Sequence, residues 1–133
     1  MYILDTNVIS AVRRPDRAPR VAAWLQGKAE QDLFLSVITL GEIERGIHQQ
    51  ETRDPDFARD LRAWLDRTVL LFSDRLLPFE AEDARIWGRL SAEIGHNGAD
   101  LMIAASALRH AATVVTGNTR DFVPTGIALE DPF

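Results

Sequence analysis

Four acidic residues in this sequence stand beside apolar segments, where their carboxylates could act together. Asp5 ends the first apolar run, and Glu42 lies shortly after the second. Asp100 begins a long apolar stretch, and Asp121 follows the next apolar run. Carboxylates gathered without a basic partner repel one another, so such a cluster makes sense where a divalent cation holds it together. Because the chain has no cysteine and no histidines at metal-ligand spacing, the oxygen donors favour Mg²⁺ or Mn²⁺ over zinc.

Each acid taken alone also has a structural explanation. Asp5 could cap the helix that follows it. Thr39 and Glu42 fit a capping box, in which Glu42 bonds back to the backbone at the start of a helix. Asp100 could stabilise a helix N-terminus through the helix dipole, and Asp121 could form a turn. The metal site is favoured only when the four acids are considered together.

Strands and helices are expected to alternate along the chain. Short apolar runs predict four strands and a possible fifth, at residues 2–4, 33–37, 76–79, 113–116 and 127–129. Apolar residues at helical spacing predict helices at 7–12, 20–28, 39–50, 55–68, 81–94 and 101–112. This alternation implies an α/β fold, in which a parallel sheet of four to five strands is flanked by helices on both faces.

The predicted sheet also indicates where a ligand would bind. In an open parallel sheet, ligands bind beyond the carboxyl ends of the strands. All four acids fall at such positions, and two polar residues, Thr116 and Asn118, stand beside the last of them. We therefore expect the carboxylates to converge at one edge of the sheet.

Composition narrows the class of protein. The chain has 133 residues, which suits a single domain over residues 1–133. Its net charge of −5 argues against a broad, non-specific grip on nucleic acid. No apolar run reaches the roughly 18 residues of a membrane span, and the start of the chain is unlike a signal peptide, so we expect a cytoplasmic protein without a membrane partner. Glycine-rich nucleotide loops and a G-x-S-x-G nucleophile motif are absent.

Several segments agree, in order and spacing, with a known family. They are residues 2–7 (YILDTN), 36–43 (SVITLGEI), 100–105 (DLMIAA) and 116–122 (TGNTRDF). Together they resemble the PIN-domain family, and in particular VapC-type toxins of type II toxin–antitoxin modules. Residues 77–79 (LPF) and 87–90 (WGRL) strengthen the likeness to the FitB-like branch of these toxins. The resemblance covers nearly the whole chain and implies a PIN-like, Rossmann-like parallel sheet wrapped by helices.

This resemblance implies a metal-dependent endoribonuclease that hydrolyses RNA phosphodiester bonds. By that likeness, Asp5, Glu42 and Asp100 are the core metal ligands. Asp121 fills a fourth acidic position, although some members carry an acid where this chain has Asn118. One or two Mg²⁺ or Mn²⁺ ions held there would activate a water and stabilise charge on the scissile phosphate. Polar support around the site would come from Thr6, Asn7, Thr116 and Asn118.

Two other functions stay open at this point. One is a non-catalytic PIN-like module that binds RNA or a protein, and the presence of all four acids disfavours it. The other is a PIN-type DNA nuclease, which the absence of an added DNA-gripping arch disfavours.

Apolar side chains on the predicted helices indicate protein partners. Phe57, Trp64 and Trp87 give two helices more large apolar surface than a thin domain readily covers, so we expect a homodimer. The resemblance also implies a small antitoxin, whose disordered C-terminal tail would fold along a helix groove and direct a basic residue at the acids. We expect the walls of that groove at Val8, Ile9, Val12, Leu25 and the helix over residues 40–47.

Overall fold

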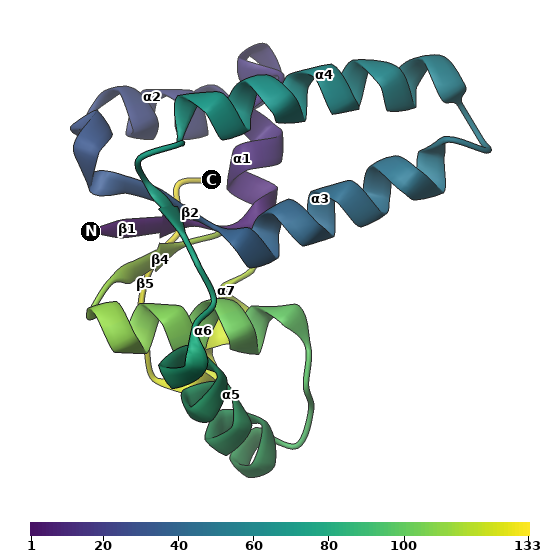
Figure 1. The fold of residues 1–133 in the computed structure, drawn as a ribbon. Coiled ribbons are helices and arrows are strands. Elements are labelled where there is room, and N and C mark those ends of the chain that lie inside the picture. The colour runs from purple at the N-terminus through teal and green to yellow at the C-terminus, as the bar shows by residue number, and fades with distance from the viewer.

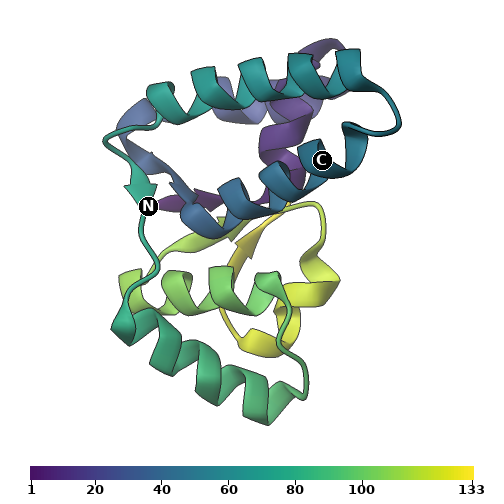
Figure 2. The same ribbon diagram turned by 45° about the vertical axis from the view of Figure 1, so that its right-hand side comes forward.

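A computed structural model of residues 1–133 contains one five-stranded sheet, in which every neighbouring pair of strands is parallel (Figures 1 and 2). The strand order is β3–β2–β1–β4–β5. In β1, which is central, Tyr2 pairs with Leu33 of β2 and with Thr113 of β4. The predicted α/β fold is confirmed, including the possible fifth strand. The strands are β1 (Tyr2–Leu4), β2 (Leu33–Ser36), β3 (Leu76–Leu77), β4 (Thr113–Val115) and β5 (Ala128–Glu130).

The chain covers one face of the sheet before it covers the other (Figure 1). The first face carries α1 (Thr6–Val12), α2 (Pro19–Gln26), α3 (Val37–Gln50) and α4 (Pro55–Leu71). The second carries α5 (Ala81–Ile94), α6 (Ala99–His110) and the short α7 (Thr119–Phe122). Three 3₁₀ turns complete the chain, η1 (Pro15–Arg17), η2 (Glu30–Asp32) and η3 (Val123–Thr125). None of these helices is long and apolar enough to cross a membrane.

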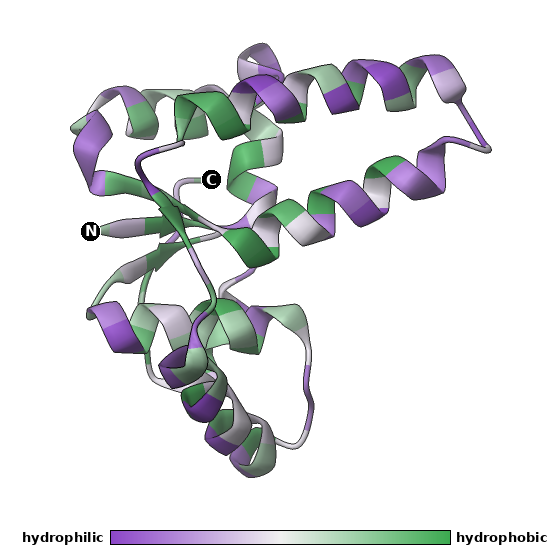
Figure 3. Ribbon diagram, viewed as in Figure 1, coloured by the Kyte–Doolittle hydropathy of each residue, from purple (hydrophilic) through white to green (hydrophobic).

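Two hydrophobic cores, one on each face, hold the sheet in place. Successive strand residues point to opposite faces, so Leu4 packs with Val8 and Ile47 in one core, whereas Ile3 packs with Ile103 in the other. Each of these five side chains is at most 1% exposed. The strands are largely hydrophobic, and the turn between α3 and α4 is hydrophilic (Figure 3). The carboxyl ends of β1 and β4 are thus fixed from both sides.

Helix α3 begins two residues earlier than the sequence pattern predicts. Its N-cap is Ser36, whose Oγ accepts a hydrogen bond from the backbone N–H of Ile38 at 3.1 Å. Thr39 lies inside the helix and is fully buried, so the capping box expected for Thr39 and Glu42 is wrong. Serine directly after the strand satisfies the first helical N–H groups, and this leaves the Glu42 carboxylate available for another role.

The expected groove along the early helices is not one continuous surface. Val8 and Ile9 belong to the core, with 0% and 3% of their surface exposed. Val12 and Leu25 line an apolar cavity of about 230 Å³ between α1, α2 and the end of α4. Helix α3 instead lines a separate groove with α1 and α4. A seven-residue helix turns too many of its apolar residues towards the sheet for them to form an outer wall as well.

Candidate active site

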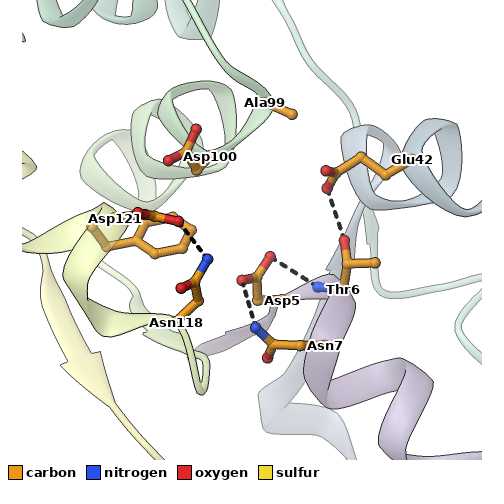
Figure 4. Close-up of a pocket in the computed structure, with 9 residues that line it drawn as sticks. Asp5, Thr6, Asn7, Glu42, Ala99, Asp100, Asn118 and Asp121 are labelled. Atoms are coloured by element: carbon orange, nitrogen blue, oxygen red, sulfur yellow. Dashed lines mark hydrogen bonds between the residues drawn. The ribbon is translucent and has the colours of Figure 1, made fainter. Parts of the chain in front are cut away.

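The four acids predicted from the sequence line one pocket at the carboxyl edge of the sheet (Figure 4). The cavity has a volume of about 410 Å³ and lies where β1 and β4 end. No arginine, lysine or histidine is among its lining residues. The lining consists of Asp5, Thr6, Asn7, Glu42, Ala99, Asp100, Asn118, Asp121 and Phe122.

Asp5 is the most buried of the acids, with 7% of its surface exposed. It is the N-cap of α1 and accepts a hydrogen bond from the Thr6 backbone N–H at 2.8 Å. Burial raises the pKa of this carboxyl, the hydrogen bonds from Thr116 and Thr6 lower it, and the charges of Asp100 and Asp121 raise it further. The rise in pKa shows that the folded protein holds the Asp5 charge in an unfavourable environment.

Thr116, at the end of β4, fixes the direction of the Asp5 carboxylate. Its fully buried hydroxyl accepts from Asn7 Nδ2 at 3.2 Å and from the Asn118 backbone N–H at 2.9 Å. Its own hydrogen is then donated to Asp5 Oδ2 at 2.8 Å. The backbone N–H of Gly117, the next residue, donates to Asn7 Oδ1 at 3.1 Å. These contacts hold α1 and the loop after β4 in fixed relation around Asp5.

Glu42 reaches the pocket from α3, and Asp5 lies between it and the two acids Asp100 and Asp121 (Figure 4). Its side chain is exposed, and Oε1 accepts a hydrogen bond from the Thr6 hydroxyl at 2.8 Å. Thr6 therefore links the Glu42 carboxylate to the helix that Asp5 caps. This contact joins residues 36 positions apart, and no local sequence pattern indicates it.

Asp100 lies in the first turn of α6, and its carboxylate lies close to Gly98, the N-cap of this helix. A Cβ atom at Gly98 would lie 2.7 Å from Asp100 Oδ1 and 3.3 Å from His96 Nδ1. His96 Nδ1 accepts the Gly98 backbone N–H at 3.2 Å, so this histidine shapes the turn before α6 and does not line the pocket. The sequence marks Asn97 and Gly98 as a break before this helix, but it does not show that Gly98 lies against the Asp100 carboxylate.

Asp121 lies in α7, where the sequence pattern predicted only a loop. Its exposed carboxylate accepts a hydrogen bond from Asn118 Nδ2. Asn118 thus lies between Asp121 and the Thr116 hydroxyl, which receives the Asn118 backbone N–H. The two candidates for the fourth acidic position are adjacent and hydrogen-bonded to each other.

The chemistry of these donors suits a divalent cation. Every polar side chain in the lining offers oxygen, and no cation in the lining offsets the carboxylates. As the side chains stand, no three of the acidic residues lie close enough together to bind one ion. Glu42 and Asp121 are exposed, and each accepts a single side-chain hydrogen bond, so both can turn inward at little cost.

The fold and the pocket define a class of protein, an α/β protein with an acidic site at the carboxyl edge of its sheet. The PIN domain family model matches residues 2–125. The chain belongs to the PIN-domain family.

Individual relatives narrow the position of the chain within this family. Toxin FitB of Neisseria gonorrhoeae is 34% identical over 100% of this chain and 99% of FitB. VapC ribonuclease Y4jK of Sinorhizobium fredii is 32% identical over 100% of this chain and 98% of its own length. The crystal structure of FitAcB from Neisseria gonorrhoeae superposes with a TM-score of 0.85 at 34% identity, over 99% of this chain and 98% of the other.

Proposed function

We propose that this protein is the toxin component of a toxin–antitoxin module and acts as a metal-dependent endoribonuclease. The observation that carries the proposal is the convergence of four carboxylates on one pocket that no basic residue lines. Relatives that align with the whole chain are named as a toxin and as a VapC ribonuclease, which supports the same activity.

In this proposal Asp5, Glu42 and Asp100 hold the ion or ions, Mg²⁺ or Mn²⁺, and Asp121 completes the set. When bound, the cation supplies a Lewis acid that offsets the charge developing on the scissile phosphate. Asp5 is already oriented by Thr6 and Thr116, so little reorganisation is needed there. An inward turn of Glu42 would bring its carboxylate towards Asp5 and Asp100, and one carboxylate of the pocket would accept the proton of the attacking water.

Cleavage of RNA should depend strictly on a divalent metal. With purified protein and total RNA, we expect cuts in Mg²⁺ or Mn²⁺, none in excess EDTA, and full recovery when Mg²⁺ is restored. Sequencing the new RNA ends identifies the substrate. Binding of RNA without cuts at any metal concentration would instead indicate a non-catalytic module, and preferential cutting of DNA would indicate a DNA nuclease.

We also propose that a small antitoxin controls the site. Solved relatives include toxin–antitoxin complexes, such as DNA-bound VapBC from Salmonella typhimurium, 25% identical with a TM-score of 0.77 over 99% of this chain and 98% of that chain. The groove between α1, α3 and α4 fits an amphipathic tail, because it is lined by Ile43, Ile47, Leu61 and Trp64 and shares Glu42 with the acidic pocket.

A basic residue at the end of that tail should carry the inhibition. The tail's cation would pair with the carboxylates and compete with the metal, while its apolar residues supply affinity. Replacing only this basic residue by glutamine should leave the complex assembled in gel filtration yet restore RNA cleavage at high Mg²⁺. Equal inhibition by both tails at every Mg²⁺ concentration would show that the antitoxin acts by steric exclusion of RNA alone.

We propose, finally, that the protein pairs as a homodimer. Trp64 and Trp87 pack against the two cores and leave less apolar surface than the sequence pattern indicated. Leu70 and Leu71 at the end of α4 are the better candidates, with 75% and 60% of their surface exposed. Light scattering at micromolar concentration should give twice the 14.9 kDa of one chain, and Leu70→Gln should shift it towards 14.9 kDa. A 14.9 kDa species for the unaltered protein contradicts the proposal.

A further inference from the structure

Arginines gather at the end of α1 without acidic partners. Between residues 13 and 20 the chain carries four arginines and one aspartate, although its net charge is −5. Arg13, Arg14 and Arg17 form no ion pair. Burial, and then the charges of Arg14 and Arg17, lower the pKa of the Arg13 guanidinium, while Asp60 acts in the opposite direction. Unpaired cations this close together favour a polyanionic partner.

Arg13 is held in place by an aromatic ring. Its guanidinium carbon lies 5.0 Å from the centre of the Phe57 ring, in cation–π contact, and the side chain is half-buried. A guanidinium held in this way loses less freedom when it binds a phosphate, and its planar fork matches two phosphate oxygens. A lysine at the same place would offer the charge without that geometry.

Arg13 lines a groove that begins at the acidic pocket, and Arg14 and Arg17 follow it directly in the chain. A cavity of about 300 Å³ is lined by Thr6, Ser10, Arg13, Glu42 and Phe57 among other residues. Thr6 and Glu42 also line the acidic pocket, so the two cavities adjoin. From Thr6 to Arg13 the helix rises roughly 10 Å, which is about three nucleotide steps at the ~3.4 Å spacing of a stacked strand.

We propose that Arg13, Arg14 and Arg17 bind phosphates of the RNA strand on one side of the bond to be cut. This inference rests on the proposed ribonuclease function and names the residues that position its substrate. The acidic pocket repels a phosphodiester chain, so attraction must come from elsewhere on the surface. The arginine cluster supplies that attraction at the end of a groove leading away from the pocket, and a strand lying there runs along α1.

The test is the salt dependence of RNA binding in protein that cannot cut. In an Asp100→Asn background without metal, anisotropy measures the affinity for fluorescein-labelled oligo-uridine over a range of salt concentrations. Arg14→Gln with Arg17→Gln should weaken binding about tenfold or more and lower the salt slope by about 1.4, because two phosphate contacts to a single strand are lost. Arg13→Lys should weaken binding while leaving the slope nearly unchanged.

The matched control is Arg85→Gln with Arg89→Gln, which removes two exposed, unpaired arginines from α5 on the opposite face. If the two double variants weaken RNA binding equally, the effect comes from net charge alone and the proposal is overturned. Unchanged RNA binding in Arg14→Gln with Arg17→Gln would overturn it as well. Weaker binding of the antitoxin tail with unchanged RNA binding would assign the cluster to a protein contact. A failure of the proposed ribonuclease function would give a different result. The unaltered protein would then bind oligo-uridine but cut no RNA with Mg²⁺ or Mn²⁺.

Discussion

Asp5→Asn or Asp100→Asn should lower RNA cleavage at least about 100-fold, the loss expected when several kcal/mol of charge stabilisation disappear. Both residues line the acidic pocket, and Asp5 is the buried acid that three side-chain and backbone donors orient. Initial rates on a labelled RNA fragment in saturating Mg²⁺ measure the effect. Full RNA cleavage by either variant would show that the replaced residue is not a ligand of the catalytic metal.

The fold should survive these substitutions. Burial raises the pKa of Asp5 above that of the free carboxyl. At a pH where Asp5 is ionised in the folded protein, its charge therefore lowers the free energy of unfolding. This destabilisation disappears as the pH falls and the carboxyl becomes protonated. Asparagine removes the destabilisation, and we expect a melting temperature in metal-free buffer that is level or higher. Glu93→Gln, which removes one negative charge from an exposed position of α5, should change neither RNA cleavage nor the melting temperature.

Asp121→Asn should reduce RNA cleavage less than Asp5→Asn or Asp100→Asn does, because Asn118 lies beside it.

Arg75→Met should be among the most destabilising single changes in the chain. Arg75 is 7% exposed, and its guanidinium donates to the carbonyl oxygens of Glu30, Leu33 and Leu71 at 2.8, 2.9 and 2.9 Å. It also stacks 4.6 Å from the centre of the Phe72 ring. Methionine fills a similar volume but removes the guanidinium hydrogen bonds to three carbonyls, of which the Glu30 carbonyl keeps only the Leu33 backbone N–H, so we expect a loss of about 3–5 kcal/mol in the free energy of unfolding.

Urea and thermal denaturation followed by circular dichroism measure this loss, which corresponds to about 10 °C or more in the melting temperature. Arg89→Met, an exposed change without an ion pair, is the control and should stay within about 0.5 kcal/mol. A loss below about 1 kcal/mol for Arg75→Met would mean that water replaces the guanidinium at those carbonyls.

The sequence predicted helix starts and strand positions correctly where neighbouring residues determine them. Asp54 followed by Pro55 predicted the start of α4, and Asp54 Oδ1 does accept the Phe57 backbone N–H at 3.1 Å. Pro78 indicated a sheet edge or a strand end, and β3 is an edge strand that ends at Leu77. The pattern failed at α3 because Ser36 and Thr39 are both good caps, and only the end of β2 decides between them.

The pocket shows a similar division between local and long-range information. The acids could be placed at one sheet edge because parallel strands end together. The Thr116 hydroxyl on Asp5 and the Thr6 hydroxyl on Glu42 join residues 111 and 36 positions apart. No local pattern marks Arg75 as buried, because two of the backbone carbonyls that it binds lie 42 and 45 positions away in the sequence. Such contacts follow from the packed fold and have no signature in the chain.

The pairing of β1 with β4 bears on when during synthesis the protein can become active. It joins residues 2–4 to residues 113–115, and Asp5 and Glu42 come from the first half of the chain whereas Asp100 and Asp121 come from the second. A ribosome makes the N-terminal half first, so the nascent chain holds only two of the four acids for most of translation. The pocket can form only after α7 has been synthesised, because Asp121 and Phe122 line it. A truncated chain that ends before α6 carries only Asp5 and Glu42 of the four acids, so we expect it to cleave no RNA.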